Sequence, residues 1–420
     1  MSNELIRIVQ ASERSAIEAL LAPTRVRDAS VERQVARIVS DVRRNGDRAL
    51  ERYAAKLDGL IGALEVPRRE WKRAAASLAP DVRRGLRQAA RHIERVARAQ
   101  VPRGFRAAVA PGIRVEQRVI PLDRVGCYVP GGRYPLPSSL LMTAIPARVA
   151  GVREVIAVCP RLDPAVLAAA AEARVDRLFQ IGGAHAIAAL AYGTAKVPRV
   201  DKIVGPGNRW VSAAKALVSS DCAIDFYAGP TEIVMVASRG PAEWIAADLI
   251  AQAEHDVDAR ALFITPNRRL AESVAREVAH QMPSTGPARS SLRHHGGIVI
   301  TRTAQEAIAL ANQAAPEHLV VDSEALARQA RTAGAVFVGA WTAQVAGDYA
   351  IGSNHVLPTA GAARFRGGLN AADFVRLVSV QRVSRRGLLR LAPTVTALAR
   401  AEGLEGHARS IEIRQGRQVG

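Results

Sequence analysis

The feature that most restricts the fold of this chain is the regular alternation of short β-branched runs with alanine-rich stretches from Gly112 onward. Runs such as 155–159 and 202–204 have the residue types of buried strands, and stretches such as 184–192 have those of helices. Consecutive parallel strands need crossover connections, so this order predicts an α/β fold with parallel sheets. Two successive doubly wound sheets, each covered by helices on both faces, fit the alternation better than one very large sheet.

Further predicted strands are 177–181, 231–236, 261–265, 297–300, 319–321 and 335–338, and further predicted helices are about 138–150, 210–218, 241–255 and 269–281. The first hundred residues are predicted to be helical. Apolar residues recur there at helical spacing from Val31 to Val42, with Asn45-Gly46 as the expected stop, and a second amphipathic helix follows Pro80. Apolar residues between Leu388 and Ala401 predict a helical tail, which carries His407.

The composition is that of an ordinary globular protein. The chain has 420 residues, of which 49% are hydrophobic and 23% charged, enough for two or more domains with substantial cores. No apolar stretch reaches the roughly 20 residues that a membrane-spanning helix needs, and the N-terminal sequence lacks the pattern of a secretory signal. We therefore expect a cytoplasmic protein that does not associate with membranes.

The formal net charge of +19 raises the question of nucleic-acid binding. The excess is almost entirely arginine, scattered along the chain in pairs such as Arg43-Arg44 and Arg385-Arg386. Neither an aromatic platform nor a recognition motif accompanies it. This pattern favours a solvated surface, and we expect no nucleic-acid partner.

Several polar residues in the last 170 positions lie in otherwise apolar or glycine-rich segments. Gln252 and His255 are three residues apart on a predicted helix, so both side chains can reach one cation, although a satisfied helix end would also explain them. Asp348 follows a predicted strand, where a turn would accept Asn or Ser equally. His407 could equally be an ordinary surface histidine if nothing else were known.

The segment Pro316-Glu317-His318 is more specific. Adjacent Glu and His at the start of a strand are expected to project to diverging sides, so that each serves a different proton transfer in one site. Histidine is the natural base near neutral pH. The alternative is a Glu-His pair on a surface loop.

Three glycine-rich turns lie at the ends of predicted strands: 128–132, 181–185 and 204–209. Glycines after strands let backbone N–H groups and helix N-termini approach a phosphate or a dinucleotide. None has the usual G-x-G-x-x-G spacing, so each could equally be a tight connection.

Together, these segments resemble the histidinol dehydrogenase family, with a match that runs from about Arg124 to Arg414. The motifs that carry the resemblance are VGCYVPGG (125–132), AHAIAALAYG (184–193), VDKIVGPGN (200–208), AGPTE (228–232), QAEH (252–255), APEHL (315–319), GDYA (347–350), NHVLPT (354–359) and EGLEGH (402–407). The number of motifs and their order make coincidence a poor explanation.

The resemblance implies an enzyme that oxidises L-histidinol to L-histidine through L-histidinal, with two NAD per product and one zinc ion per subunit. It also implies two Rossmann-like sheets in an intertwined homodimer with shared active sites. The implied division of the chain is a helical N-terminal segment (1–23), a main α/β domain (24–127 with 233–368), a second α/β domain on the NAD side (128–232) and a helical tail that reaches the partner subunit (369–420).

Site roles follow residue by residue from the matching motifs. The implied catalytic residues are His318, as base for alcohol oxidation, and Glu317, which activates the water that adds to the aldehyde. The implied zinc ligands are Gln252, His255, Asp348 and His407, which also face the substrate. The implied NAD contacts are Tyr128, His185 and Asn208, and Thr231, His318, His355 and Glu402 are the implied substrate contacts.

The chain departs from the family pattern at two of these positions. The family usually has Gln at the position of His185 and often Ser at that of Thr231, which puts the cofactor affinity and the pH profile in doubt. Cys127 could be read as a thiol nucleophile for aldehyde oxidation, but its apolar neighbours favour a packed thiol. The three cysteines, at 127, 159 and 222, have no C-x-x-C spacing and indicate neither disulfides nor a thiolate metal site.

Two other functions remain open from the sequence. A paralogue of the same fold could oxidise another polar alcohol or diol, and the presence of Glu402 and His407 favours histidinol over this alternative. A basic nucleic-acid binder would be a protein of a different class, and the scattered charge argues against it.

Overall fold

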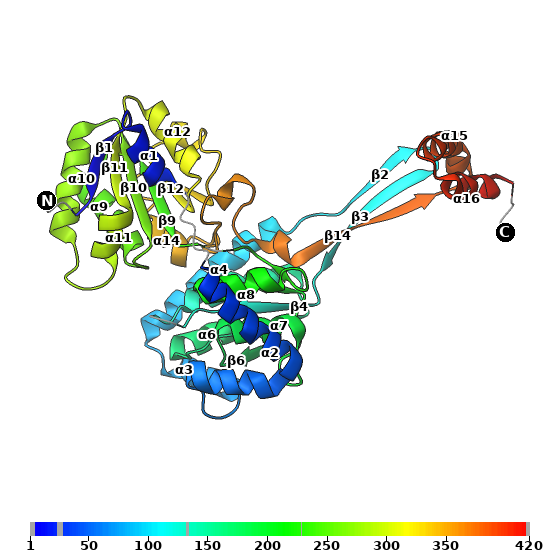
Figure 1. The fold of residues 1–420 in the computed structure, drawn as a ribbon, viewed down its shortest axis with the longest axis horizontal. Coiled ribbons are helices and arrows are strands. Elements are labelled where there is room, and N and C mark those ends of the chain that lie inside the picture. The colour runs from blue at the N-terminus through cyan, green and yellow to red at the C-terminus, as the bar shows by residue number, and fades with distance from the viewer. Residues whose placement is uncertain (1–4, 23–27, 132–133, 228, 417–420) are drawn as a thin grey trace. The chain divides into compact units, whose positions relative to one another are not determined.

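The computed structural model describes residues 5–22, 28–131, 134–227 and 229–416. The described residues form two compact units, one within the ranges 1–100 and 123–374 and the other within 101–122 and 375–420. The first unit contains two parallel sheets with helices around them, as the alternation of strand and helix signals predicts (Figure 1). The α/β fold class is therefore confirmed.

The larger sheet has six strands, all paired in parallel, in the order β1-β11-β10-β9-β12-β13. Chain order runs outward from β9 in one direction through β10 and β11, and in the other through β12 and β13. The strands are β1 (Arg7–Gln10), β9 (Glu232–Val236), β10 (Arg260–Thr265), β11 (Gly296–Ile300), β12 (His318–Val321) and β13 (Ala335–Val338).

Helices cover both faces of this sheet, and alternate residues of each strand point to opposite faces, so both sets of side chains are buried. Ile233 and Met235 pack with α9 (Ala242–Ala253), α10 (Arg268–Gln281) and α11 (Ala288–His295). Val234 and Val236 pack on the other side with α1 (Arg14–Leu21), α12 (Ala304–Ala314) and α13 (Glu324–Ala327). Continuous burial explains why these strands are apolar throughout rather than alternating.

The smaller parallel sheet has five strands in the order β6-β5-β4-β7-β8. Its strands are β4 (Arg124–Tyr128), β5 (Glu154–Val158), β6 (Arg177–Phe179), β7 (Lys202–Val204) and β8 (Ala223–Ile224), and its connecting helices are α5 (Pro137–Ala150), α6 (Pro164–Glu172), α7 (Gly183–Tyr192) and α8 (Arg209–Val218). The first strand, β4, lies at the centre of the sheet between β5 and β7.

The helices between residues 29 and 100 belong with this smaller sheet. They are α2 (Ala29–Tyr53), the π-helix η1 (Ala54–Asp58), α3 (Arg68–Ser77) and α4 (Pro80–Gln100). The apolar face of α2, including Val31 and Val35, shares one core with α7 and α8. This differs from the expected grouping of 24–127 with the larger sheet, because an apolar helix face shows that a helix is buried but not which sheet buries it.

Two other sequence expectations differ from the structure. The expected stop at Gly46 is a kink with φ of 52°, after which the helix continues to Tyr53. The segment 1–23, expected to be helical, contributes β1 as well as α1, and β1 pairs in parallel with β11. A four-residue strand has too short a pattern to reveal such a distant pairing.

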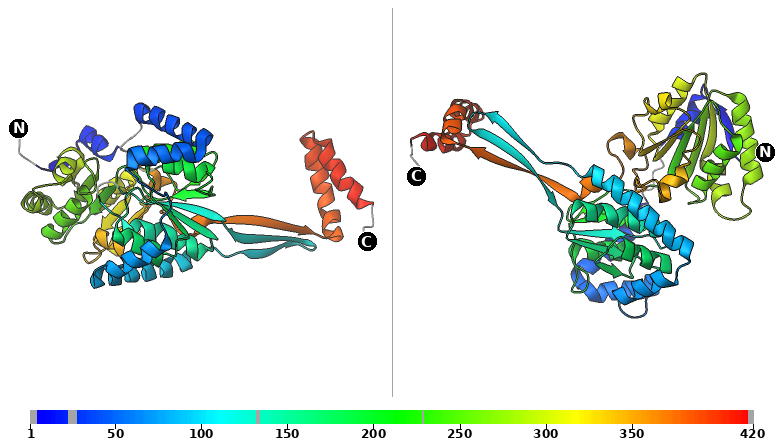
Figure 2. Two further views of the ribbon diagram at one scale, coloured as in Figure 1. Left: turned by 90° about the horizontal axis from the view of Figure 1, so that it is seen from below. Right: turned by 180° about the vertical axis from the view of Figure 1, so that it is seen from behind.

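The second unit is an antiparallel sheet of three strands in the order β14-β3-β2, followed by two helices (Figure 2). Its elements are β2 (Phe105–Ala110), β3 (Ile113–Pro121), β14 (Val375–Val383), α15 (Arg385–Ala401) and α16 (Glu405–Gln415). The tail from 369 onward was expected to be helical only, so β14 corrects that prediction. Its sequence, VRLVSVQRV, is rich in valine, which favours strands.

The remaining elements are α14 (Gln344–Tyr349) and the 3₁₀ turns η2 (Ala362–Arg364) and η3 (Ala371–Phe374). Among the described residues, the helices are all too short or too polar to cross a bilayer.

The burial of the larger sheet generates a stability prediction. Phe263 lies in β10 with none of its surface exposed, so Phe263→Ala should lower the free energy of unfolding by about 3–5 kcal/mol. The same substitution at Phe365, which is 80% exposed, should change it by less than about 0.5 kcal/mol. Urea denaturation followed by circular dichroism measures both, and equal effects of the two variants would contradict the assignment of this core.

Candidate active site

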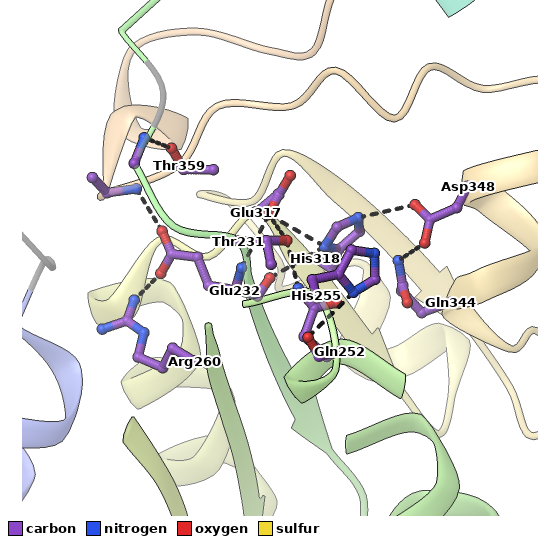
Figure 3. Close-up of polar contacts among 12 residues, drawn as sticks. Thr231, Glu232, Gln252, His255, Arg260, Glu317, His318, Gln344, Asp348 and Thr359 are labelled. Atoms are coloured by element: carbon purple, nitrogen blue, oxygen red, sulfur yellow. Dashed lines mark hydrogen bonds and ion pairs between the residues drawn. The ribbon is translucent and has the colours of Figure 1, made fainter. Parts of the chain in front are cut away.

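The centre of the candidate site lies where β9 and β12 begin. These strands are parallel neighbours with His318 opposite Ile233, so the residues just before them, Thr231 and Glu317, lie side by side (Figure 3). Thr231 Oγ1 donates a hydrogen bond of 2.5 Å to Glu317 Oε2, and the backbone N–H of Glu232 donates a second, of 3.0 Å, to the same oxygen. The carboxylate is thus fixed from two sides.

Glu317 is 6% exposed. Burial raises the pKa of its carboxyl above the ordinary value, against the opposing effects of His318 and the hydrogen bonds from Thr231 and Glu232. A carboxyl with a raised pKa is a better proton acceptor than a solvated one, which suits a general base.

His318 is 3% exposed, and its two ring nitrogens have different environments. Nδ1 lies 3.2 Å from the carbonyl oxygen of Glu232, which can only accept, so Nδ1 carries a proton and Nε2 has the free lone pair of the neutral ring. Nε2 is buried and has no hydrogen-bond partner among the described residues, with Asp348 Oδ1 3.7 Å away. Burial favours the neutral ring, but Glu317 and Asp348 outweigh it and raise the pKa of His318.

The side chains of Glu317 and His318 do not diverge as expected. His318 Nδ1 and Glu317 Oε2 are 3.7 Å apart, so the two groups share one electrostatic environment. Glu317 precedes the first residue of β12 and is not bound by the alternation of the strand.

Gln252 and His255 come from the end of α9. Gln252 Nε2 donates to Thr231 Oγ1 at 2.5 Å, while its buried Oε1 has no partner within the described part of the chain. His255 Nδ1 lies 3.0 Å from the carbonyl oxygen of Ala251, so Nδ1 carries a proton and Nε2 is free to bind a cation. The two residues therefore have one oxygen and one nitrogen atom with lone pairs that could bind a metal ion.

Asp348 faces His318 from α14. Gln344 Nε2 donates to Asp348 Oδ2 at 2.8 Å, one helical turn away. Burial alone would raise the pKa of Asp348, but His318, His355 and Gln344 hold it below the ordinary value. The role of Gln344 was missed in the sequence, although its spacing of four residues from Asp348 was a usable signal.

His355 is held within its own chain. Its Nδ1 lies 2.8 Å from the backbone oxygen of Asp348, and its Nε2 lies 3.2 Å from Ser139 Oγ. Burial lowers the pKa of His355, which favours the neutral ring. His355 therefore contacts the backbone of Asp348 and holds the turn after α14 in place.

A cavity of about 950 Å³ is lined by the candidate cofactor residues and by one candidate metal ligand. Tyr128, His185 and Asn208, the candidate cofactor residues, line it together with His255. Asn208 also caps α8, because its Oδ1 accepts from the backbone N–H groups of Trp210 and Val211 at 3.1 and 3.2 Å. A cavity of this size can hold a nucleotide.

Two candidate residues belong to the second unit. Glu402 follows the last residue of α15 and His407 lies in the first turn of α16, and both are exposed. Among the described residues, no three His, Cys, Asp or Glu side chains gather closely enough to form a metal site. Three of the four candidate ligands, Gln252, His255 and Asp348, lie in the first unit, and Gln252 is not of those four types.

Cys127 is fully buried in the centre of the smaller sheet. Burial raises the pKa of its thiol to about 12. The thiolate that a nucleophile requires is therefore disfavoured, which supports the packed thiol.

Comparisons with known proteins agree on one family. The family model described as histidinol dehydrogenase matches residues 22–415. The histidinol dehydrogenase of Thermus thermophilus is 48% identical over 397 residues, covering 92% of this chain and 95% of the relative, and that of Nitrosomonas europaea is 45% identical over 403 residues, covering 92% and 93%. The crystal structure of histidinol dehydrogenase from Elizabethkingia anophelis superimposes with a TM-score of 0.93 at 28% identity, covering 99% of each chain.

The burial of the cysteines generates a prediction about their reactivity. Burial raises the pKa of Cys159 to about 11 and that of Cys222 to about 12, as it does for Cys127. In native protein at pH 8, a thiol-specific reagent should label the three cysteines at least about 100-fold more slowly than it labels free cysteine. In denaturant the reagent should label all three at once, and rapid labelling of Cys127 in native protein would restore the nucleophile hypothesis.

Proposed function

Since the chain belongs to the histidinol dehydrogenase family, we propose that it oxidises L-histidinol to L-histidine through L-histidinal, the last step of histidine biosynthesis, with NAD and zinc. The observation that carries the proposal is the convergence of two buried proton acceptors, Glu317 and His318, with side chains that can bind a cation, beside a cavity of nucleotide size. The oxidoreductase class follows from the family. The compartment we propose is the cytoplasm.

When bound, NAD would accept the hydride of each oxidation and zinc would orient the substrate through its nitrogen and oxygen atoms. Gln252 Oε1, which lacks a partner among the described residues, and His255 Nε2 and Asp348 supply donors of types that zinc accepts. We propose His407 as the fourth ligand, from a second copy of the chain in a homodimer with shared active sites.

In the first oxidation, His318 would act as the base. Its Nε2 takes the proton of the substrate hydroxyl as the hydride leaves the adjacent carbon, which forms the aldehyde. The bond from Nδ1 to the carbonyl oxygen of Glu232 keeps the lone pair on Nε2. Asp348, 3.7 Å from Nε2, would stabilise the imidazolium that results.

In the second oxidation, Glu317 would take a proton from the water whose oxygen adds to the aldehyde carbon. The hydrated aldehyde would then lose a hydride, for which NAD is the acceptor, and its remaining hydroxyl proton, which goes to solvent, so that the product is the carboxylate of histidine. Thr231 and the Glu232 N–H leave one oxygen of Glu317 without a hydrogen bond in the described residues, which is the oxygen available to water. Keeping the aldehyde bound prevents the loss of a reactive intermediate.

We further propose that Thr231 and Glu402 contact the substrate and that Tyr128, His185 and Asn208 contact NAD. Three of these, Tyr128, His185 and Asn208, line the same cavity, which supports one cofactor site. We assign His355 to the substrate pocket through the turn that it holds after Asp348.

The substrate and the metal are tested in one assay. Purified protein with L-histidinol should form two NADH per histidine, and removal of the metal by a chelator should lower the rate at least about tenfold until zinc is restored. Simple diols serve as control substrates. A higher rate on a diol than on L-histidinol would favour the paralogous enzyme, and full activity after metal removal would contradict the zinc site.

The division of labour is tested by two variants. His318→Asn should slow alcohol oxidation about 10²–10⁴-fold, whereas Glu317→Gln should slow the oxidation of supplied L-histidinal more than that of L-histidinol. His280→Asn and Glu272→Gln, at exposed positions of α10, are matched controls that should keep the wild-type rates. Equal losses in both half-reactions for both variants would contradict separate roles.

A further inference from the structure

His185, one wall of the cavity of about 950 Å³, is paired with a carboxylate that lies 127 residues earlier in the chain. His185 Nε2 is 2.7 Å from Asp58 Oδ2, and both side chains are buried, at 1% and 8% exposure. Asp58 is the last residue of the π-helix that follows α2, and His185 lies in the first turn of α7. π-Helical turns are rare and concentrate at functional sites.

The pair is held rigidly by its surroundings. Asp58 Oδ2 also accepts the backbone N–H of Gly182 at 2.9 Å, just before α7. The ring of Tyr53 stacks on that of His185, with centroids 6.0 Å apart and planes at 28°. The imidazole is therefore fixed by a hydrogen bond at its edge and an aromatic ring on its face.

The proton positions follow from the chemistry of the partners. A carboxylate only accepts hydrogen bonds, so the Nε2 of His185 must carry the proton that Asp58 accepts. In the neutral ring this leaves the lone pair on Nδ1. Nδ1 is buried and has no hydrogen-bond partner among the described residues, and the His185 side chain is essentially fully buried. A buried acceptor of this kind is costly unless a ligand supplies a donor.

We propose that Asp58 is a positioning residue that sets the tautomer of His185, so that Nδ1 accepts a hydrogen bond from a ribose hydroxyl of the dinucleotide. This inference rests on the proposed function. Phosphate oxygens only accept hydrogen bonds and suit the N-terminus of α7, where the N-cap residue Gly182 supplies no side-chain acceptor and the N–H of Gly183 donates to Tyr128 Oη at 3.2 Å. The ribose hydroxyls are the donors adjacent to the phosphates, so they are the groups that an acceptor at this place would bind.

The test measures the dissociation constant for NAD by calorimetry, without substrate. Asp58→Ala and His185→Ala should each weaken NAD binding about tenfold, and the double variant should be no weaker than His185→Ala alone. Asp58→Asn retains an oxygen that accepts from Nε2 and from Gly182, so it should stay within about threefold of wild type.

A purely structural role for Asp58 predicts a different result. The two alanine substitutions would then act independently, and additive losses in the double variant would overturn the proposal. The tautomer is measured separately in the long-range ¹H–¹⁵N spectrum of the unmodified protein, with His185→Gln to assign the resonance among nine histidines. Protonation of His185 on Nε2 supports the proposal, and protonation on Nδ1 overturns it.

The same binding experiment separates this inference from the proposed function. Suppose that wild-type protein binds NAD, that Asp58→Ala weakens the binding as expected, and that wild-type protein forms no NADH from L-histidinol. This result would support the inference and contradict the proposed substrate. Wild-type protein that forms NADH from L-histidinol, with NAD affinity unchanged by Asp58→Ala, would overturn the inference alone. Wild-type protein that binds no NAD would overturn both.

Discussion

The parallel pairing of β9 with β12 is the constraint on which the candidate site depends. It places residues 231 and 317 side by side although 86 positions separate them in the sequence. The strands are buried on both faces, so their register is fixed by the core on each side. A shift of one residue would turn His318 to the opposite face of the sheet and break the contacts of Glu317 with Thr231 and Glu232.

Around that pairing, Gln252, His255 and His318 are each held by a hydrogen bond from the side chain, and a second polar atom of each side chain remains available for a ligand. Thr231 donates to Glu317 and accepts from Gln252, which leaves Gln252 Oε1 without a partner among the described residues. The backbone accepts from Nδ1 of both His318 and His255, which leaves Nε2 of each ring for chemistry or for a cation. Fixing the ligands before the substrate arrives reduces the ordering that binding would otherwise require.

The smaller sheet supplies the other half of the site through its turns. The Gly182-Gly183 turn leads directly into α7, and a Cβ at position 182 would lie 2.4 Å from Pro160. Only glycine permits that approach, which places His185 against Asp58 at the edge of the cavity. The contribution of Asp58 had no sequence signal, because nothing in its local pattern points to a partner in another helix.

The sequence by itself determined the α/β class, most strand positions and the family, because buried parallel strands leave apolar runs and the motifs of the site are local. It also singled out Gln252, His255, Glu317, His318 and Asp348, which the structure brings to one region. Only the tertiary structure decided which sheet α2 packs against, that β1 and β14 are strands, and which ring nitrogen carries the proton in His185, His255 and His318. Those outcomes depend on partners distant in sequence, and local residue patterns carry no information about such partners.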